Sequence, residues 1–168
     1  MKLYAILFAS LFMLASVTLK AQKYAYVNSS QIIMMHPGVK AADQKLMNYQ
    51  NDLISKGEAM AKKLESNYNA YVTEENSGTL SKMQMQEKET ALAQEQEAIQ
   101  RYEVEIQQKI LSKREELYQP ILNEIQSAVE AVGKENGYSM IFDTSTGGIL
   151  HAKESENIFD KVKAKLGL

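Results

Sequence analysis

Residues 76–79 read Asn-Ser-Gly-Thr, and they lie near the midpoint of the longest stretch of the chain without proline. That stretch spans 82 residues between Pro37 and Pro120, and it is rich in Glu, Gln, Lys, Leu, Ala and Met, which favour helix. Gly78 is the strongest turn signal within it. The pattern predicts two helices of about 39 and 41 residues, each about 60 Å long, that fold back on each other at this turn.

Apolar residues recur at helical spacing along both predicted helices. In the second helix Met85, Leu92, Ile99 and Ile106 are seven residues apart, which is the spacing of seam positions in an antiparallel coiled coil. The alternate seam positions hold Lys, Glu or Gln, so the seam is thin. We therefore expect the outer half of the hairpin to open or bend easily, with Gly57 as a natural bend.

The two ends of the chain predict one small head. Short strands are expected at residues 23–27, 138–142 and 149–152, the last two joined by a glycine turn. Pro120 should either kink a helix or start a new one, and Ser155 should cap a final helix. A core of about 60 to 65 residues is marginal alone and leaves sheet edges uncovered, so the head should form an oligomer.

The first 21 residues have the pattern of a secretory signal peptide. Lys2 provides a positive start, residues 3–19 are largely apolar, and Ala21 is a small residue suited to a cleavage site. An uncleaved membrane anchor is the alternative. The predicted organisation is a signal peptide at 1–21, a β-rich oligomerisation head at 22–36 and 120–168, and a helical hairpin arm at 37–119 with its tip near 76–80.

Composition argues against several classes of function. The chain has no cysteine and only two histidines, His36 and His151, so we expect no catalytic residue, no cofactor and no metal site. Gly147 and Gly148 lie in a predicted turn and not in a phosphate-binding loop. Residues 22–168 carry 17 basic and 21 acidic side chains, and this acidic balance disfavours nucleic acid as a partner.

Several local stretches resemble one protein family. Tyr26-Val27-Asn28 with Pro37-Gly38 resembles the entry segment of the Skp/OmpH family of periplasmic chaperones. Residues 118–143 resemble its helix-to-strand return, and residues 148–150 and 157–162 resemble its final strand and helix. The resemblance implies a mainly α, jellyfish-like homotrimer, in which helical arms project from a small β-rich head and enclose a cavity.

The same resemblance implies a function. It suggests an ATP-independent periplasmic holdase, exported and not integral to the membrane, that binds unfolded outer-membrane proteins before their insertion. The best-known member of the family is strongly basic, whereas residues 38–119 here carry 11 basic and 14 acidic side chains. We therefore carry over neither a lipopolysaccharide site nor electrostatic capture of acidic clients. A non-catalytic coiled-coil structural or adaptor protein of the cell envelope is the alternative. In either role the exported chain could lie close to a membrane without being integral to it.

Two sets of residues are candidates for these roles. Methionine and tyrosine near the tip offer flexible and amphipathic contacts for unfolded clients, although they could instead fill the coiled-coil seam. The expected client-binding residues are Met60, Tyr68, Tyr71, Met83 and Met85. The expected core of the head and its oligomer consists of Tyr26, Val27, Ile33, Met140, Ile141, Phe142, Ile149, Leu150, Ile158 and Val162.

Overall fold

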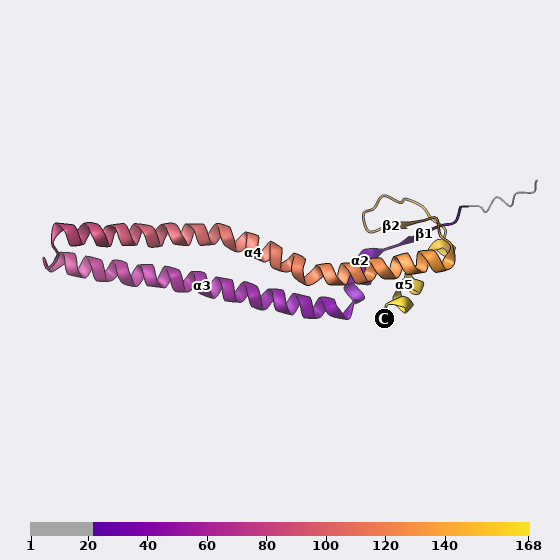
Figure 1. The fold of residues 1–168 in the computed structure, drawn as a ribbon, viewed down its shortest axis with the longest axis horizontal. Helices are drawn as coiled ribbons and strands as arrows, with labels where there is room; N and C mark the ends of the chain where they lie inside the picture. Colours follow the sequence, from indigo (N-terminus) through magenta and orange to yellow (C-terminus); the bar gives the residue numbers. More distant parts are fainter. Residues whose placement is uncertain (1–21) are drawn as a thin grey trace, which may run out of the picture.

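The computed structural model describes residues 22–168, so the predicted signal peptide lies outside the described residues. A long helical hairpin projects from a small head that contains the two strands (Figure 1). This confirms the predicted fold class of a mainly helical chain with a small β part. In chain order the elements are β1 (Tyr24–Val27), α2 (Ser29–Met35), α3 (Pro37–Asn76), α4 (Lys82–Asn136), β2 (Met140–Asp143), the 3₁₀ turn η1 (Glu154–Glu156) and α5 (Phe159–Lys165).

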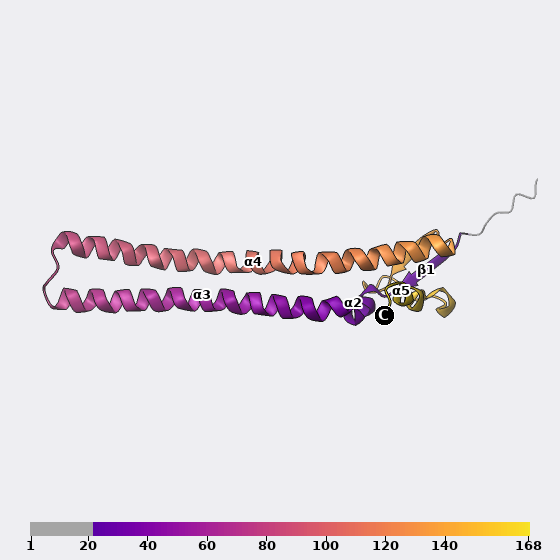
Figure 2. The ribbon, with the colours of Figure 1, turned by 60° about the horizontal axis from the view of Figure 1, so that its bottom comes forward.

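The helices α3 and α4 run side by side in opposite directions along the whole arm (Figures 1 and 2). Between them, Gly78 adopts a positive φ of 67°, which glycine reaches without steric cost. Ser81 then starts α4 with a capping box, in which its side chain accepts from Gln84 N–H and the Gln84 side chain accepts from Ser81 N–H. The turn chemistry and the cap together end one helix and start the next.

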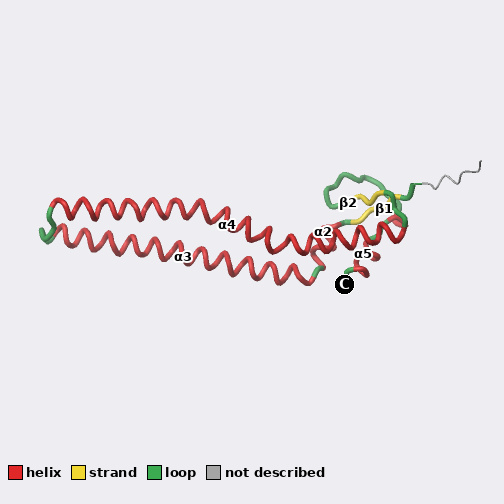
Figure 3. The backbone as a smooth tube through the Cα atoms, in the orientation of Figure 1, coloured by secondary structure: helices red, strands yellow, loops and turns green. Residues whose placement is uncertain are grey.

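The helix α4 continues from the arm into the head without a break. Pro120 lies inside its 55 residues, and Figure 3 shows one unbroken helical trace that bends on its way to the head. The prediction that Pro120 starts a new helix is therefore wrong. The helix ends at Gly137, which has a positive φ of 67° and donates its N–H to carbonyls of the last turn.

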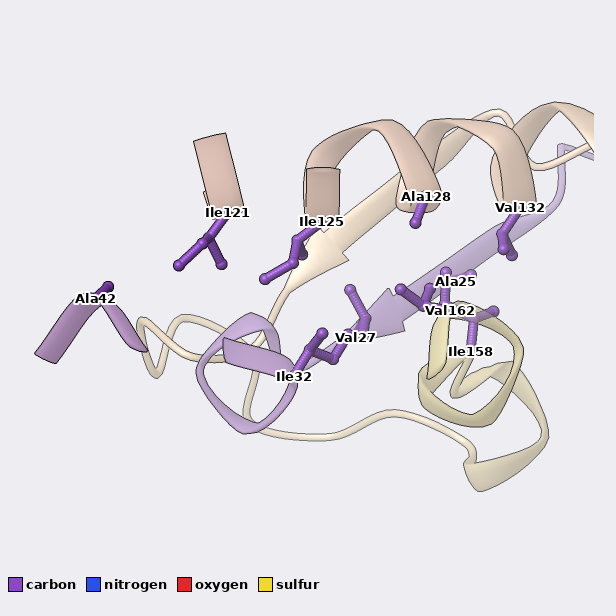
Figure 4. Close-up of a cluster of buried hydrophobic side chains, with 10 residues drawn as sticks. All are labelled: Ala25, Val27, Ile32, Ala42, Ile121, Ile125, Ala128, Val132, Ile158 and Val162. Carbon is purple, nitrogen blue, oxygen red and sulfur yellow. The ribbon is translucent and has the colours of Figure 1, made fainter. Parts of the chain in front are cut away.

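The core of the head forms where β1, α2, α5 and the last turns of α4 meet (Figure 4). Ile32, Ile158 and Val162 are its most buried side chains. The same cluster contains Ala25, Val27, Ala42, Ile121, Ile125, Ala128 and Val132. Because α4 supplies four of these residues, the head and the arm share one continuous helix as their support.

The sheet has two parallel strands in the described part of the chain. Tyr24 lies opposite Met140 and Val27 lies opposite Asp143. The predicted return strand at 149–152 is wrong, because these residues form no strand. Asp143 accepts hydrogen bonds from the backbone N–H groups of Ser29 and Ser145, which holds the turn after β2 against the start of α2. The chain next pairs with the sheet at Asn157, which forms a single parallel bridge with Tyr26 of β1.

The start of the last helix also differs from the sequence expectation. Ser155 lies in η1 and does not cap α5, whose N-cap position is the fully buried Ile158. The polar contact at this helix start comes from the preceding Asn157, whose Oδ1 accepts the N–H of Phe159 at 3.0 Å. Within residues 22–168, none of the helices combines the length and the apolar content needed to cross a bilayer.

Candidate functional site

The seam between α3 and α4 is sparsely filled. Along residues 43–120 the structure buries only Leu53, Tyr71 and Tyr102. Tyr102 donates its hydroxyl to the Leu53 carbonyl across the seam at 3.0 Å. The apolar repeat of the sequence therefore yields few fully buried contacts, and much of its side-chain surface remains open to solvent.

Polar contacts link the two helices in the outer half of the arm. The Tyr71 hydroxyl donates to Glu89 at 2.7 Å, and this hydrogen bond is the main cause that raises the pKa of Tyr71 to about 12. Glu95 accepts from Asn67 at 2.9 Å and pairs with Lys63 at 3.0 Å. These two partners, Asn67 first, lower the pKa of Glu95.

A groove of 580 Å³ lies between the helices in this outer half, and we name it the distal groove. Its floor is apolar, and both helices contribute to it. The lining residues are Ala61, Leu64, Glu65, Tyr68, Tyr71, Glu89, Leu92, Ala93, Gln96 and Ile99. A shallow apolar groove of this kind can hold a side chain of another polypeptide, whereas its polar groups form no constellation suited to acid–base or nucleophilic chemistry.

The predicted client-binding residues are only partly brought together. Tyr68 and Tyr71 both line the distal groove. Tyr68 is 56% exposed, whereas Tyr71 is buried in the seam. Met83 is 69% exposed and lines a separate groove of 460 Å³ on α4. Met60 and Met85 are half-buried and line neither groove.

Seven of the ten residues predicted for the core of the head are buried or half-buried in the single chain. Val27, Ile158 and Val162 are buried, and Ile33 and Ile141 pack against them. Tyr26 and Ile149 are half-buried.

Three residues of the same prediction do not belong to the core of the single chain. Met140, Phe142 and Leu150 are exposed. They lie on or beyond β2, whose outer edge pairs with no strand among residues 22–168. Phe142 lines a third groove of 310 Å³, on the head, together with Tyr24, Ile149 and His151.

His36 has a structural role that sequence reasoning missed. Its Nδ1 accepts the N–H of Gly38 and caps α3, while its Nε2 lies 3.3 Å from a carboxylate oxygen of Glu124 in α4. The His36 side chain therefore links the N-terminal end of α3 to α4. The available signal was its position directly before Pro37, because proline favours the first turn of a helix and the preceding residue is then a cap. Among residues 22–168 there is no group of His, Asp and Glu side chains that could hold a metal ion.

A long antiparallel hairpin on a small β-containing head defines the structural class of this chain. The family model for the outer membrane protein (OmpH-like) family matches residues 23–166. The chain therefore belongs to the OmpH-like family. No curated protein sequence matches it.

A solved structure shares the fold. It is the crystal structure of a Caulobacter crescentus CB15 protein assigned as an OmpH-like outer membrane chaperone. The TM-score is 0.71 at 16% sequence identity, and the match covers 86% of this chain and 83% of that chain. At this level of identity the likeness supports the fold and leaves the function to be argued from the molecule.

Proposed function

We propose that this protein is an ATP-independent holdase that binds unfolded outer-membrane proteins in the periplasm and keeps them from aggregating before insertion. One observation carries the proposal: the long arm of an OmpH-like chain leaves an apolar groove and large apolar side chains open to solvent in place of a filled seam. Removal of the N-terminal segment as a signal peptide on export is part of the proposal.

The geometry suits weak and adaptable binding. Tyr68 and Met83 lie on different faces near the tip, and both side chains can contact apolar as well as polar partners. Contacts of about 1 kcal/mol each are released easily, yet several arms acting together give useful avidity. The arms would act through binding alone, without catalysis or a cofactor.

A homotrimer that assembles through the head is the second part of the proposal. The exposed Met140, Phe142 and Leu150, the head groove and the unpaired edge of β2 support it, because an exposed apolar edge favours pairing with another copy. We expect a trimer mass in light scattering at micromolar concentration. A monomer mass would contradict the assembly and with it the avidity argument.

The function is tested by diluting an urea-unfolded outer-membrane β-barrel protein into buffer without ATP. We expect light scattering to be suppressed by this protein and not by an unrelated helical protein at the same concentration. Scattering that rises equally in both samples would overturn the holdase proposal. That result would favour the adaptor alternative. A rigid adaptor would need a well-filled seam, however, and the seam of this arm is sparsely filled.

A further inference from the structure

The rim of the distal groove carries negative charge without compensation from lysine or arginine. Glu65 and Glu89 line it, and no basic residue does. Glu89 is engaged by the Tyr71 hydroxyl. For Glu65, the structure of residues 22–168 contains no ion pair. An exposed carboxylate beside an apolar floor is therefore available to a partner of opposite charge.

Three tyrosines in the middle and inner parts of the arm are covered by cations of the chain itself. Lys56 lies 5.1 Å from the ring centre of Tyr102. Lys113 lies 5.8 Å from that of Tyr49. Arg114 stands at the same distance from Tyr118. A cation over a tyrosine ring is attracted by the negative face of the ring.

Tyr68 lacks such a partner in the described structure, because none of the cation–π pairs of residues 22–168 includes its ring. It is 56% exposed. It follows Glu65 by three positions on α3, and this spacing places both residues on one face of the helix. A cation at this place would contact the ring and the carboxylate together.

We propose that the distal groove binds unfolded segments in which a lysine or arginine lies beside an aromatic or aliphatic residue. The cation lies over Tyr68 and against Glu65, and the neighbouring apolar side chain enters the groove between Leu64 and Leu92. The charge of the surrounding arm agrees, since residues 56–100 carry 5 basic and 8 acidic side chains. The inference rests on the proposed holdase function and names the chemistry that its arms select.

The test uses the full mature protein and three labelled peptides of equal length, in which phenylalanine alternates with lysine, glutamate or serine. Fluorescence anisotropy should show the tightest binding for the lysine peptide. This preference should shrink between about 50 mM and about 300 mM salt, because exposed charges are screened over shorter distances at higher ionic strength. Equal or tighter binding of the glutamate peptide would overturn the inference.

Matched variants locate the interaction. Glu65→Gln should weaken binding of the lysine peptide by about two- to fivefold, as expected for loss of one exposed charge pair. Glu115→Gln removes another exposed carboxylate, from the part of α4 nearer the head and outside the groove, and should leave the affinity unchanged. Equal effects of the two variants would overturn the assignment to the groove.

A third variant tests the ring. Tyr68→Leu keeps an apolar side chain but removes the ring, so it should weaken binding of the lysine peptide more than binding of the serine peptide and thereby reduce the preference for lysine. An unchanged preference would overturn the role of the ring. The aggregation assay on wild-type protein separates the two proposals, because suppression without a preference for lysine refutes only the inference, whereas failure of suppression refutes the holdase function.

Discussion

At the scale of single residues, two helical glycines differ in what surrounds them. A methyl group on Gly57 would lie 3.5 Å from the ring of Tyr102, which is ordinary contact, whereas one on Gly133 would lie 3.0 Å from a methyl group of Ile141. Gly133 therefore permits close packing of α4 on β2. Gly57 lies within a continuous α3 and fills no comparable need, so its cost to helix stability is not offset by packing.

We expect Gly57→Ala to raise the free energy of unfolding by up to about 1 kcal/mol, because alanine is the better helix former. Urea unfolding followed by circular dichroism measures this change. Gly133→Ala is the matched variant, and crowding against Ile141 should cancel its gain. Equal stabilisation by both substitutions would contradict the packing account of Gly133.

The Tyr71 hydroxyl gives the outer arm a dependence on alkaline pH. Its pKa in the folded protein is raised from the ordinary value of 10.0 to about 12, chiefly by the hydrogen bond to Glu89. Because the pKa of Tyr71 is higher in the folded than in the unfolded chain, its hydroxyl stabilises the fold fully at a pH below the pKa of the unfolded chain. This stabilisation is lost as the pH rises through the pKa of the folded chain. The outer arm should therefore loosen between about pH 10 and about pH 12.

The comparison of wild type with Tyr71→Phe tests this expectation. Burial and Glu154 also raise the pKa of Tyr26, and the hydrogen bond to Asp43 raises the pKa of Tyr118, so difference absorbance should show one fewer late-titrating tyrosine in the variant than in wild type. The pH dependence of helix content in that range should be weaker in the variant. If the same late titration persists in Tyr71→Phe, the tyrosine responsible lies elsewhere.

At the scale of elements, α4 begins with a capping box at its tip. The Ser81 side chain accepts from Gln84 N–H at 3.3 Å, and Gln84 Oε1 accepts from Ser81 N–H at 2.9 Å. Removing the hydroxyl in Ser81→Ala should cost about 1 kcal/mol of local helix stability. Hydrogen exchange at the first turn of α4 should therefore speed up, with little change in the head.

A second serine serves as the control for this prediction. Ser112 lies in the interior of α4, where it cannot cap the helix, so Ser112→Ala should not accelerate exchange at the tip. Similar acceleration in both variants would show that a general change in the helix, and not the cap, controls the tip.

The helices and strands also show where local sequence signals were sufficient to predict secondary structure. The glycine at the tip and the helix-forming composition on either side predicted α3 and α4 because helix propensity and turn geometry act over a few residues. The strand expected at 149–152 is wrong because a strand needs a partner edge, and the chain after β2 pairs with the sheet only at Asn157, which bridges Tyr26 of β1. Local residue pattern carries no information about such a distant contact.

At the scale of the whole molecule, burial is unevenly distributed. The fully buried Ile32, Ile158 and Val162 all lie in the head, whereas polar contacts such as Tyr71–Glu89 link the outer arm. Regions with few buried apolar contacts open with a low free energy. Within α3 and α4 we therefore expect hydrogen exchange to be fastest near residues 64–100 and slowest near residues 121–132. Uniform protection along α4 would contradict this gradient.

The candidate site required both kinds of information. The sequence pointed to tyrosine and methionine near the tip, and Tyr68 and Tyr71 do share a groove. The sequence did not show that Tyr71 is buried while Tyr68 is exposed. It also did not show that Met83 lines a different groove. Nor did it reveal the uncovered carboxylate of Glu65 beside Tyr68, because the absence of a cation partner depends on which side chains of α3 and α4 meet.

The residue pattern was enough to predict the hairpin, its turn and the family resemblance, since these depend on helix propensity, glycine geometry and residue order along the chain. Three features could be seen only in the folded chain: the parallel pairing of β1 with β2, the contact of His36 with Glu124 and the opening of the distal groove. Each of these depends on contacts between residues far apart in the chain. These contacts form when the ends of the chain come together in the head or when α3 and α4 meet along the arm, and the order of neighbouring residues does not specify them.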